Sequence, residues 1–219
     1  MAKQALNFTQ FASYLPKGVI DEIKKWFEKY SIQLIITRER KSILGNYTHP
    51  HARQAYHKIT INGNQNPYSF LITLLHELAH LQAFVTYGLK IAPHGKEWQD
   101  VYRNIIKHYL GKGIFPPDIE SVLLQSLTRV RAGSCTDKHL YKALAQYDAE
   151  PVDGLKWVEE LQPDTYFVDR NGKVYQLKHK RRTRFLCEQL PTRKQYLFQP
   201  VARVRPISAE QVAAKGLLD

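Results

Sequence analysis

The stretch from Pro67 to Tyr87 limits the fold of this chain most strongly, because it joins a leucine-rich helical pattern to a cluster of ionisable side chains. At about 100° per residue, one side of the predicted helix is polar and the other apolar. The polar side carries Thr73, His76, Glu77 and His80, and the apolar side carries Leu71, Leu74, Leu75, Leu78 and Val85. We therefore expect one face to build a core and the other to present imidazoles.

The centre of this helix reads His76-Glu77-Leu78-Ala79-His80, which is an H-E-x-x-H motif. Two histidines one turn apart can bind the same ion, and neutral imidazole nitrogen is a preferred ligand of Zn²⁺ at about 2.0–2.1 Å. Glu77 follows the first histidine and is placed to take a proton from an attacking water. The motif predicts a zinc-dependent metallopeptidase in which His76 and His80 bind the metal and Glu77 is the catalytic general base.

A catalytic zinc commonly has three protein ligands, so a third is expected elsewhere in the chain. His94 follows His80 by 14 residues, which leaves room for the helix to end near Gly88 and for the chain to turn back. A proline and a glycine flank His94 and favour a tight backbone course there. Glu97, on the next predicted helix, is the competing ligand, and His108 is a more distant one. We expect the metal to be held by His76, His80 and His94.

The remaining patterns predict an α+β protein in two parts, with a small antiparallel or mixed sheet beside the helices. Residues 1–150 form the predicted catalytic domain and residues 151–219 a small β-rich domain. Helices are expected near 19–30, 96–109, 119–130 and 137–147, and strands at 32–37 and 56–62. Later strands are expected at 165–168, 173–177, 183–187 and 195–204, with a tight turn at 169–172 and an interruption at Pro200.

The net charge of +12 is concentrated near the C-terminus. Residues 170–206 contain eleven lysines and arginines and one acidic residue, Glu188. Such a patch can neutralise phosphates, and nearby aromatic side chains such as Tyr175, Phe185 and Tyr196 can offer stacking surfaces. The alternative is a solvated basic surface over an aromatic core. The residues expected to contact DNA are Lys178, Lys180, Arg181, Arg182 and Arg184.

Other features narrow the class of protein. No apolar run approaches the roughly 18 residues that span a bilayer, and the first residues lack a secretory pattern, so no membrane partner is expected. Cys135 and Cys187 lie too far apart in sequence for a C-x-x-C pair, which argues against a disulfide framework and a cysteine zinc site. We predict a cytoplasmic protein that acts on a protein or peptide substrate. Nothing in the sequence indicates an oligomeric state.

The motifs resemble those of the SprT-like family. The resemblance is carried by residues 74–80 joined to residues 94–98, and more weakly by residues 41–45 and 59–62, within roughly 15–110. It implies a zincin-like, minigluzincin-type peptidase domain, with His76, His80 and His94 as ligands and Glu77 as base. The family includes Spartan-type proteases, which cut proteins crosslinked to DNA and need DNA for activity. Many members also carry a four-cysteine zinc ribbon.

This chain departs from that pattern because Cys187 is its one cysteine after residue 150. We therefore expect one zinc ion, no zinc ribbon, and a metal-free basic domain in its place. Two functional classes follow. The first is a zinc metallopeptidase that acts on proteins, including DNA-associated ones. The second is a zinc-containing nucleic-acid-associated or regulatory module with little or no proteolysis. Glu77 favours the enzyme, because a structural zinc fills four positions with protein ligands and needs no base.

Overall fold

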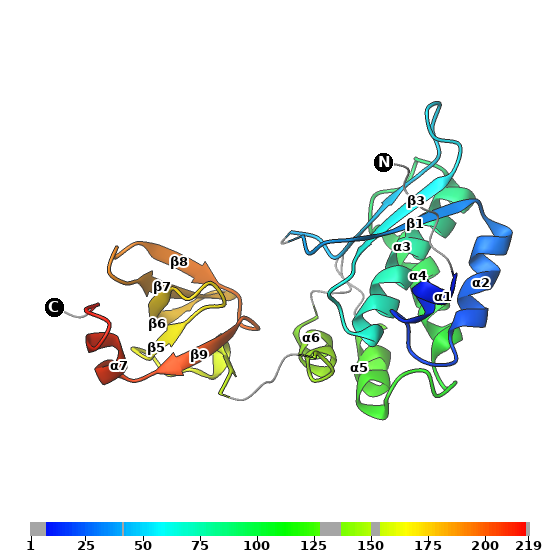
Figure 1. Ribbon diagram of the computed structural model, residues 1–219. Helices are drawn as coiled ribbons and strands as arrows, with labels where there is room; N and C mark the ends of the chain where they lie inside the picture. The colour runs from blue at the N-terminus through cyan, green and yellow to red at the C-terminus, as the bar shows by residue number, and fades with distance from the viewer. Residues whose placement is uncertain (1–7, 41, 128–136, 150–153, 218–219) are drawn as a thin grey trace. The chain divides into compact units, whose positions relative to one another are not determined.

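The computed structural model describes residues 8–40, 42–127, 137–149 and 154–217. The chain divides into two compact units, Met1–Ala149 and Glu150–Asp219 (Figure 1). The first unit combines helices with a small mixed sheet, and the second is built mainly of antiparallel strands. This confirms the predicted α+β class. No helix in the described part of the chain is both long enough and apolar enough to cross a membrane.

The first unit contains six helices and three strands among its described residues. The helices are α1 (Phe8–Ala12), α2 (Ile20–Lys29), α3 (Pro67–Tyr87), α4 (Lys96–Tyr109), α5 (Pro117–Leu127) and α6 (Lys138–Ala145). The strands are β1 (Ile32–Thr37), β2 (Gly45–Thr48) and β3 (His57–Asn62). The expected helix at 119–130 extends past the described residues at its C-terminal end, and Lys41 and Cys135 also lie outside the described ranges.

The small sheet has the order β1-β3-β2, so β2 lies at one edge. Strand β3 pairs parallel with β1 and antiparallel with β2, which makes the sheet mixed. The patterns at 32–37 and 56–62 predicted β1 and β3 closely. No pattern predicted β2, because four residues that begin with a glycine carry too little periodicity to indicate a strand. This unpredicted strand lies directly against α3.

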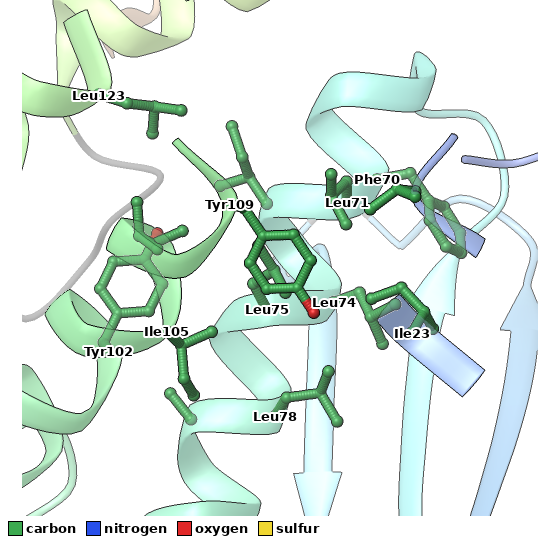
Figure 2. Packing of buried hydrophobic residues seen from close by; sticks show 14 of the residues in the cluster. Ile23, Phe70, Leu71, Leu74, Leu75, Leu78, Tyr102, Ile105, Tyr109 and Leu123 are labelled. Atoms are coloured by element: carbon green, nitrogen blue, oxygen red, sulfur yellow. The ribbon is translucent and has the colours of Figure 1, made fainter. Parts of the chain in front are cut away.

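Helix α3 is the centre of the first unit (Figure 2). Leu71, Leu74, Leu75 and Leu78 are fully buried, and they pack with residues of α2, α4 and α5 such as Ile23, Ile105 and Leu123. The helix begins with a cap in which Asn66 Oδ1 accepts the Ser69 N–H at 3.0 Å, followed by Pro67 at the first helical position. It ends at Gly88, whose positive φ of 68° suits glycine.

The two-faced helix expected from the sequence is only partly right. The polar side of α3 is not open to water, since Thr73 is 2% exposed and Glu77 is 5% exposed beneath the sheet. Val85 was assigned to the core face but is 48% exposed. The last turn, from Val85 to Tyr87, is exposed on all sides, so a helical period carries no information about burial there.

The second unit is a six-stranded sheet with the order β4-β9-β5-β6-β7-β8. Its elements are β4 (Lys156–Trp157), η2 (Val158–Glu160), β5 (Tyr166–Val168), β6 (Val174–Arg181), β7 (Arg184–Gln189), β8 (Gln195–Phe198), β9 (Arg203–Ile207) and α7 (Ala209–Ala213). Its core includes Phe167, Tyr175, Leu177 and Cys187. The strand pattern expected at 195–204 with an interruption at Pro200 corresponds to two strands, β8 and β9, between which the chain turns at Pro200.

Candidate metal centre

Three imidazole nitrogens meet at one point beside α3. The Nε2 atoms of His76 and His80 are 3.2 Å apart, and each lies 3.0 Å from Nε2 of His94. A tetrahedral ion with Zn–N distances of 2.0–2.1 Å needs ligand nitrogens about 3.3 Å apart. The observed triangle is close to that spacing. His76, His80 and His94 form the one such metal-ligand cluster found among the described residues, and they suit a transition-metal ion.

The backbone around His94 turns sharply to bring its imidazole to the helix. His94 has a positive φ of 58°, and Gly95 forms the N-cap of α4. A Cβ on Gly95 would lie 3.0 Å from the carbonyl oxygen of Ala92, so a side chain there would require a small shift of the turn. The Gln99 side chain donates to the His94 carbonyl at 2.9 Å and holds the turn from the other side. Such strained, braced backbone is typical of functional sites.

Burial keeps the three imidazoles in the neutral form that binds metals. Burial, together with the neighbouring His80 and His94, lowers the pKa of His76 to about 3. Burial also lowers the pKa of His80 to about 4, with a contribution from His94. The pKa of His94 is lowered for the same reason. The ligands therefore need no deprotonation at neutral pH, and protons compete weakly with a metal.

Trp98 of α4 forms a flat apolar support under the triad. Its ring centroid lies 4.7 Å from that of His76, 5.1 Å from that of His80 and 4.6 Å from that of His94. Trp98 is 1% exposed, and the Tyr102 ring, which stacks on it at 5.1 Å, lies 5.9 Å from that of His76. One tryptophan therefore contacts all three ligand rings and limits how far each can rotate.

Glu77 lies next to the triad in a buried position against strand β2. An added Cβ on Gly45 would be 2.6 Å from Glu77 Oε1, so the strand approaches the carboxylate as closely as a glycine allows. Burial raises the pKa of Glu77 to about 8, and both the charge of Arg40 and a hydrogen bond from the Tyr47 main-chain N–H oppose this rise. A raised pKa near neutrality is typical of a general acid or base.

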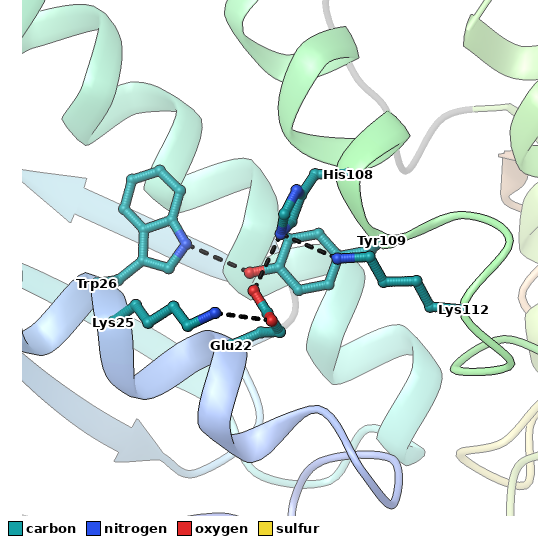
Figure 3. Close-up of polar contacts among 6 residues, drawn as sticks. All are labelled: Glu22, Lys25, Trp26, His108, Tyr109 and Lys112. Atoms are coloured by element: carbon teal, nitrogen blue, oxygen red, sulfur yellow. Dashed lines mark hydrogen bonds and ion pairs between the residues drawn. The ribbon is translucent and has the colours of Figure 1, made fainter.

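The two alternative ligands lie elsewhere. Glu97 is exposed and is not part of the histidine cluster. His108, on the last turn of α4, bonds instead to Glu22 of α2, with Nε2 and Oε2 3.0 Å apart (Figure 3). Hydrogen bonds from His108 and from Lys25 lower the pKa of Glu22 to about 2. His108 therefore belongs to a polar contact between two helices rather than to the metal centre.

A model of the SprT-like family matches residues 20–120. This segment belongs to the SprT-like family. The match confirms the resemblance expected from the motifs and supports a metallopeptidase-like fold. It extends from α2 into α5, so it includes the three histidines, Glu77 and the whole small sheet. No match was found among solved structures.

The SprT-like domain contains three residues near Glu77 to which the sequence pattern assigned no role: Arg40, Gly45 and Tyr47. Arg40 donates hydrogen bonds to Asn62 Oδ1 at 2.8 Å and Thr60 Oγ1 at 2.9 Å, which fixes its guanidinium beside β3. Gly45 lies in the segment that contributed weakly to the family resemblance, and this is the one sequence signal that pointed to β2. The contacts themselves depend on the path of β2.

The predicted DNA-contacting residues lie on the β6–β7 hairpin outside the SprT-like domain. Lys180, Arg181, Arg182 and Arg184 are exposed around its tip, residues 180–184. Lys178 differs, because its Nζ donates to Gln176 and lies 3.9 Å from the carboxylate of Glu188. Tyr175 and Phe185, expected as stacking surfaces, are buried core residues because they point to the inner face of the sheet. Tyr196 is 39% exposed.

We predict that replacing any one of His76, His80 and His94 with glutamine lowers zinc affinity by more than roughly 100-fold, since even outer-shell changes at metal sites cost 10–100-fold. The measurement is competition with a chelator of known affinity. Glu97→Gln and His108→Gln are the matched controls, and both should bind zinc like the wild type. A larger loss of zinc affinity in Glu97→Gln than in His94→Gln would identify Glu97, not His94, as the third ligand.

A second prediction concerns the stability of the metal-free protein. The pKa of Glu77 is about 8 when folded and near its ordinary 4.5 when unfolded, so the folded state binds more protons between these values. Glu77 therefore lowers stability progressively as the pH rises from about 4.5 to about 8. Glu77→Gln should stabilise the metal-free protein at pH 8 by more than about 2 kcal/mol, and far less at pH 4.5.

Urea denaturation with a chelator present, at several pH values, measures this difference. Glu97→Gln, which removes an exposed carboxyl from α4, is the control for the loss of one acidic group. A stability difference between Glu77→Gln and wild type that stays constant from pH 4.5 to pH 8 would contradict the buried position of this carboxyl.

Proposed function

We propose that the SprT-like domain is a zinc-dependent metallopeptidase that hydrolyses peptide bonds. The observation that carries this proposal is the set of three converging imidazoles directly beside a buried carboxyl with a raised pKa. Three protein ligands rather than four are typical of a catalytic zinc, because the fourth position stays open to water and substrate. The family match supports the same class of enzyme.

Zinc, when bound, would supply a Lewis acid that makes water easier to deprotonate and polarises the substrate carbonyl. Glu77 would accept the proton of the attacking water and pass it to the leaving amine. The Tyr47 N–H and the Arg40 charge favour the ionised carboxylate, which is the form that can accept a proton. Burial opposes them, so the carboxyl remains basic enough to act near neutral pH.

A peptide is the substrate class that best suits the surroundings of this site. Strand β2, which contacts Glu77, is the edge strand of the small sheet. Edge strands bind extended peptides through main-chain hydrogen bonds. The exposed side chains of Ile43 and Leu44, at 43% and 38%, lie just before this strand and offer apolar contacts to a substrate.

The second unit favours an association with DNA. Four exposed cationic side chains surround the tip of the β6–β7 hairpin. A cluster of positive charges is sufficient for electrostatic attraction to DNA phosphates. We propose that this tip brings the peptidase to DNA-associated proteins.

The alternative, a nucleic-acid-associated or regulatory module that retains zinc without efficient proteolysis, predicts DNA binding and zinc binding without cleavage. A cytoplasmic location remains a prediction from the sequence.

Glu77→Gln should keep zinc and lose cleavage. The amide is nearly isosteric but cannot accept the proton, and loss of a general base typically costs about 10²–10⁴-fold in rate. Cleavage of a protein substrate, with and without DNA, and zinc content measured on the same samples test this. Glu97→Gln is the control and should cleave like wild type. Full cleavage by Glu77→Gln would disprove the mechanism, and zinc without cleavage in the wild type would favour the regulatory module.

Replacing Lys180, Arg181, Arg182 and Arg184 together with glutamine should weaken DNA binding and flatten its dependence on salt. Each phosphate contact contributes about 0.9 to the slope of log affinity against log salt for duplex DNA. Fluorescence anisotropy at several salt concentrations measures the slope. The control removes the same number of exposed charges from the same unit, at Lys156, Lys173, Arg205 and Lys215. If both variants changed DNA affinity and its salt dependence equally, the hairpin tip would not be the DNA-binding site.

A further inference from the structure

The aromatic ring of Tyr47 lies between a metal-binding histidine and a second, buried histidine. It stacks on His80 with a centroid distance of 6.4 Å and an interplanar angle of 4°. It also stacks on His57, at 5.9 Å and 22°. Since His80 is packed against Trp98 as well, two aromatic rings bound the His80 imidazole. Rotation of His80 away from the triad would require movement of one of them.

The main chain of the same residue holds the catalytic base. The Tyr47 N–H donates a hydrogen bond to the Glu77 carboxylate. Two residues earlier, Gly45 lies against Glu77 Oε1 and against the Thr73 side chain, where a Cβ would be within 2.6 Å and 2.8 Å of their atoms. The short strand therefore contacts Glu77 through its backbone and His80 through a side chain.

His57 fixes the orientation of the Tyr47 ring. The Tyr47 hydroxyl and His57 Nδ1 are 2.8 Å apart. His57 is 9% exposed, and its ring meets Tyr30 edge-on at 6.0 Å and Phe84 edge-on at 6.1 Å. Its main-chain N–H donates to the Ser31 carbonyl at 2.8 Å. A buried histidine held in this way restricts the Tyr47 hydroxyl to one orientation.

We propose that Tyr47 is a positioning residue of the metal centre, which aligns the ligand His80 with its ring and the base Glu77 with its main chain, and that His57 fixes its hydroxyl. This deepens the proposed function and rests on it for the role of Glu77. The part of the proposal that concerns the alignment of His80 depends only on the histidine triad. Outer-shell contacts of this kind orient ligands before the metal arrives.

The two contacts of Tyr47 have separable consequences. The ring acts on a metal ligand, so its loss should change metal affinity and the geometry of the bound ion. The main chain acts on the base, so a displacement of β2 at Gly45 should change turnover and leave metal affinity unchanged. A residue that only stabilised the fold would change neither property in a folded variant.

The experiment compares Tyr47→Leu, which removes the flat ring but keeps apolar bulk, with Tyr47→Phe, which removes the hydroxyl alone. Tyr30→Phe is the matched control, because its hydroxyl bonds to Gln82 on α3 at 2.9 Å without touching Glu77 or His80. Zinc affinity is measured by chelator competition, and ligand geometry by the visible absorption spectrum of the cobalt-loaded protein. Thermal unfolding of each metal-free variant reports on folding.

We expect Tyr47→Leu to bind zinc roughly 10–100-fold more weakly and to show an altered cobalt spectrum. Tyr47→Phe should show a smaller change in the same direction, and Tyr30→Phe should match the wild type. Wild-type zinc affinity and spectrum in Tyr47→Leu would overturn the proposal. If Tyr47→Leu fails to fold, Tyr47→Phe and His57→Phe decide, and unchanged cobalt spectra in both would overturn it.

Gly45→Ala tests the contact with the base. The added methyl would displace the Glu77 carboxylate, so kcat should fall at least about tenfold while zinc affinity is kept, as a misplaced catalytic group costs rate rather than binding. Wild-type kcat in this variant would overturn that half of the proposal. A wild type that binds zinc but cleaves nothing would refute the proposed function, whereas the zinc and cobalt measurements on Tyr47 variants would still decide the alignment of His80.

Discussion

The first unit depends on the burial of α3 on nearly all sides. Its leucines pack against α2, α4 and α5, while β2 and β3 cover the face that carries Thr73 and Glu77. A helix enclosed in this way cannot rotate without exposing apolar surface or burying further polar groups, and both cost free energy. The direction of His76 and His80 is therefore set by the core and does not require a bound metal.

This enclosure also determines the charges at the site. Burial favours neutral imidazoles and a neutral carboxyl, so the histidines are ready to bind a cation while Glu77 is held above its ordinary pKa. The charge of Arg40 and the Tyr47 main-chain N–H partly offset this for Glu77. Asn62 is 1% exposed, and its amide donates to the Arg40 and Ile43 carbonyls at 3.2 Å and 2.9 Å. The loop that leads into β2 is thus tied to the centre of the sheet.

Much of this was predictable from local patterns. The periodicity of α3 and α4 predicted their bounds, and Gly88 marked the end of α3, because such end signals act within one or two turns. The choice of His94 over Glu97 rested on spacing and on the resemblance. Strand β2 was not predicted, since a four-residue edge strand is stabilised by its partner and by α3, not by its own sequence. The exposure of Val85 escaped prediction for a related reason, because burial depends on neighbours distant in the chain.

By itself, the sequence determined the residue types and spacings that local rules can interpret: an H-E-x-x-H helix, a histidine 14 residues later, a single cysteine after residue 150 and a basic β-rich segment. The tertiary structure decided which groups act together. It brought Tyr47 between His80 and His57, placed Gly45 against Glu77, and separated the exposed hairpin tip from the buried Tyr175 and Phe185. The contacts of Tyr47 and Gly45 join segments far apart in the chain, and they form only when the core closes around α3. The burial of Tyr175 and Phe185 depends on the separate core of the second unit.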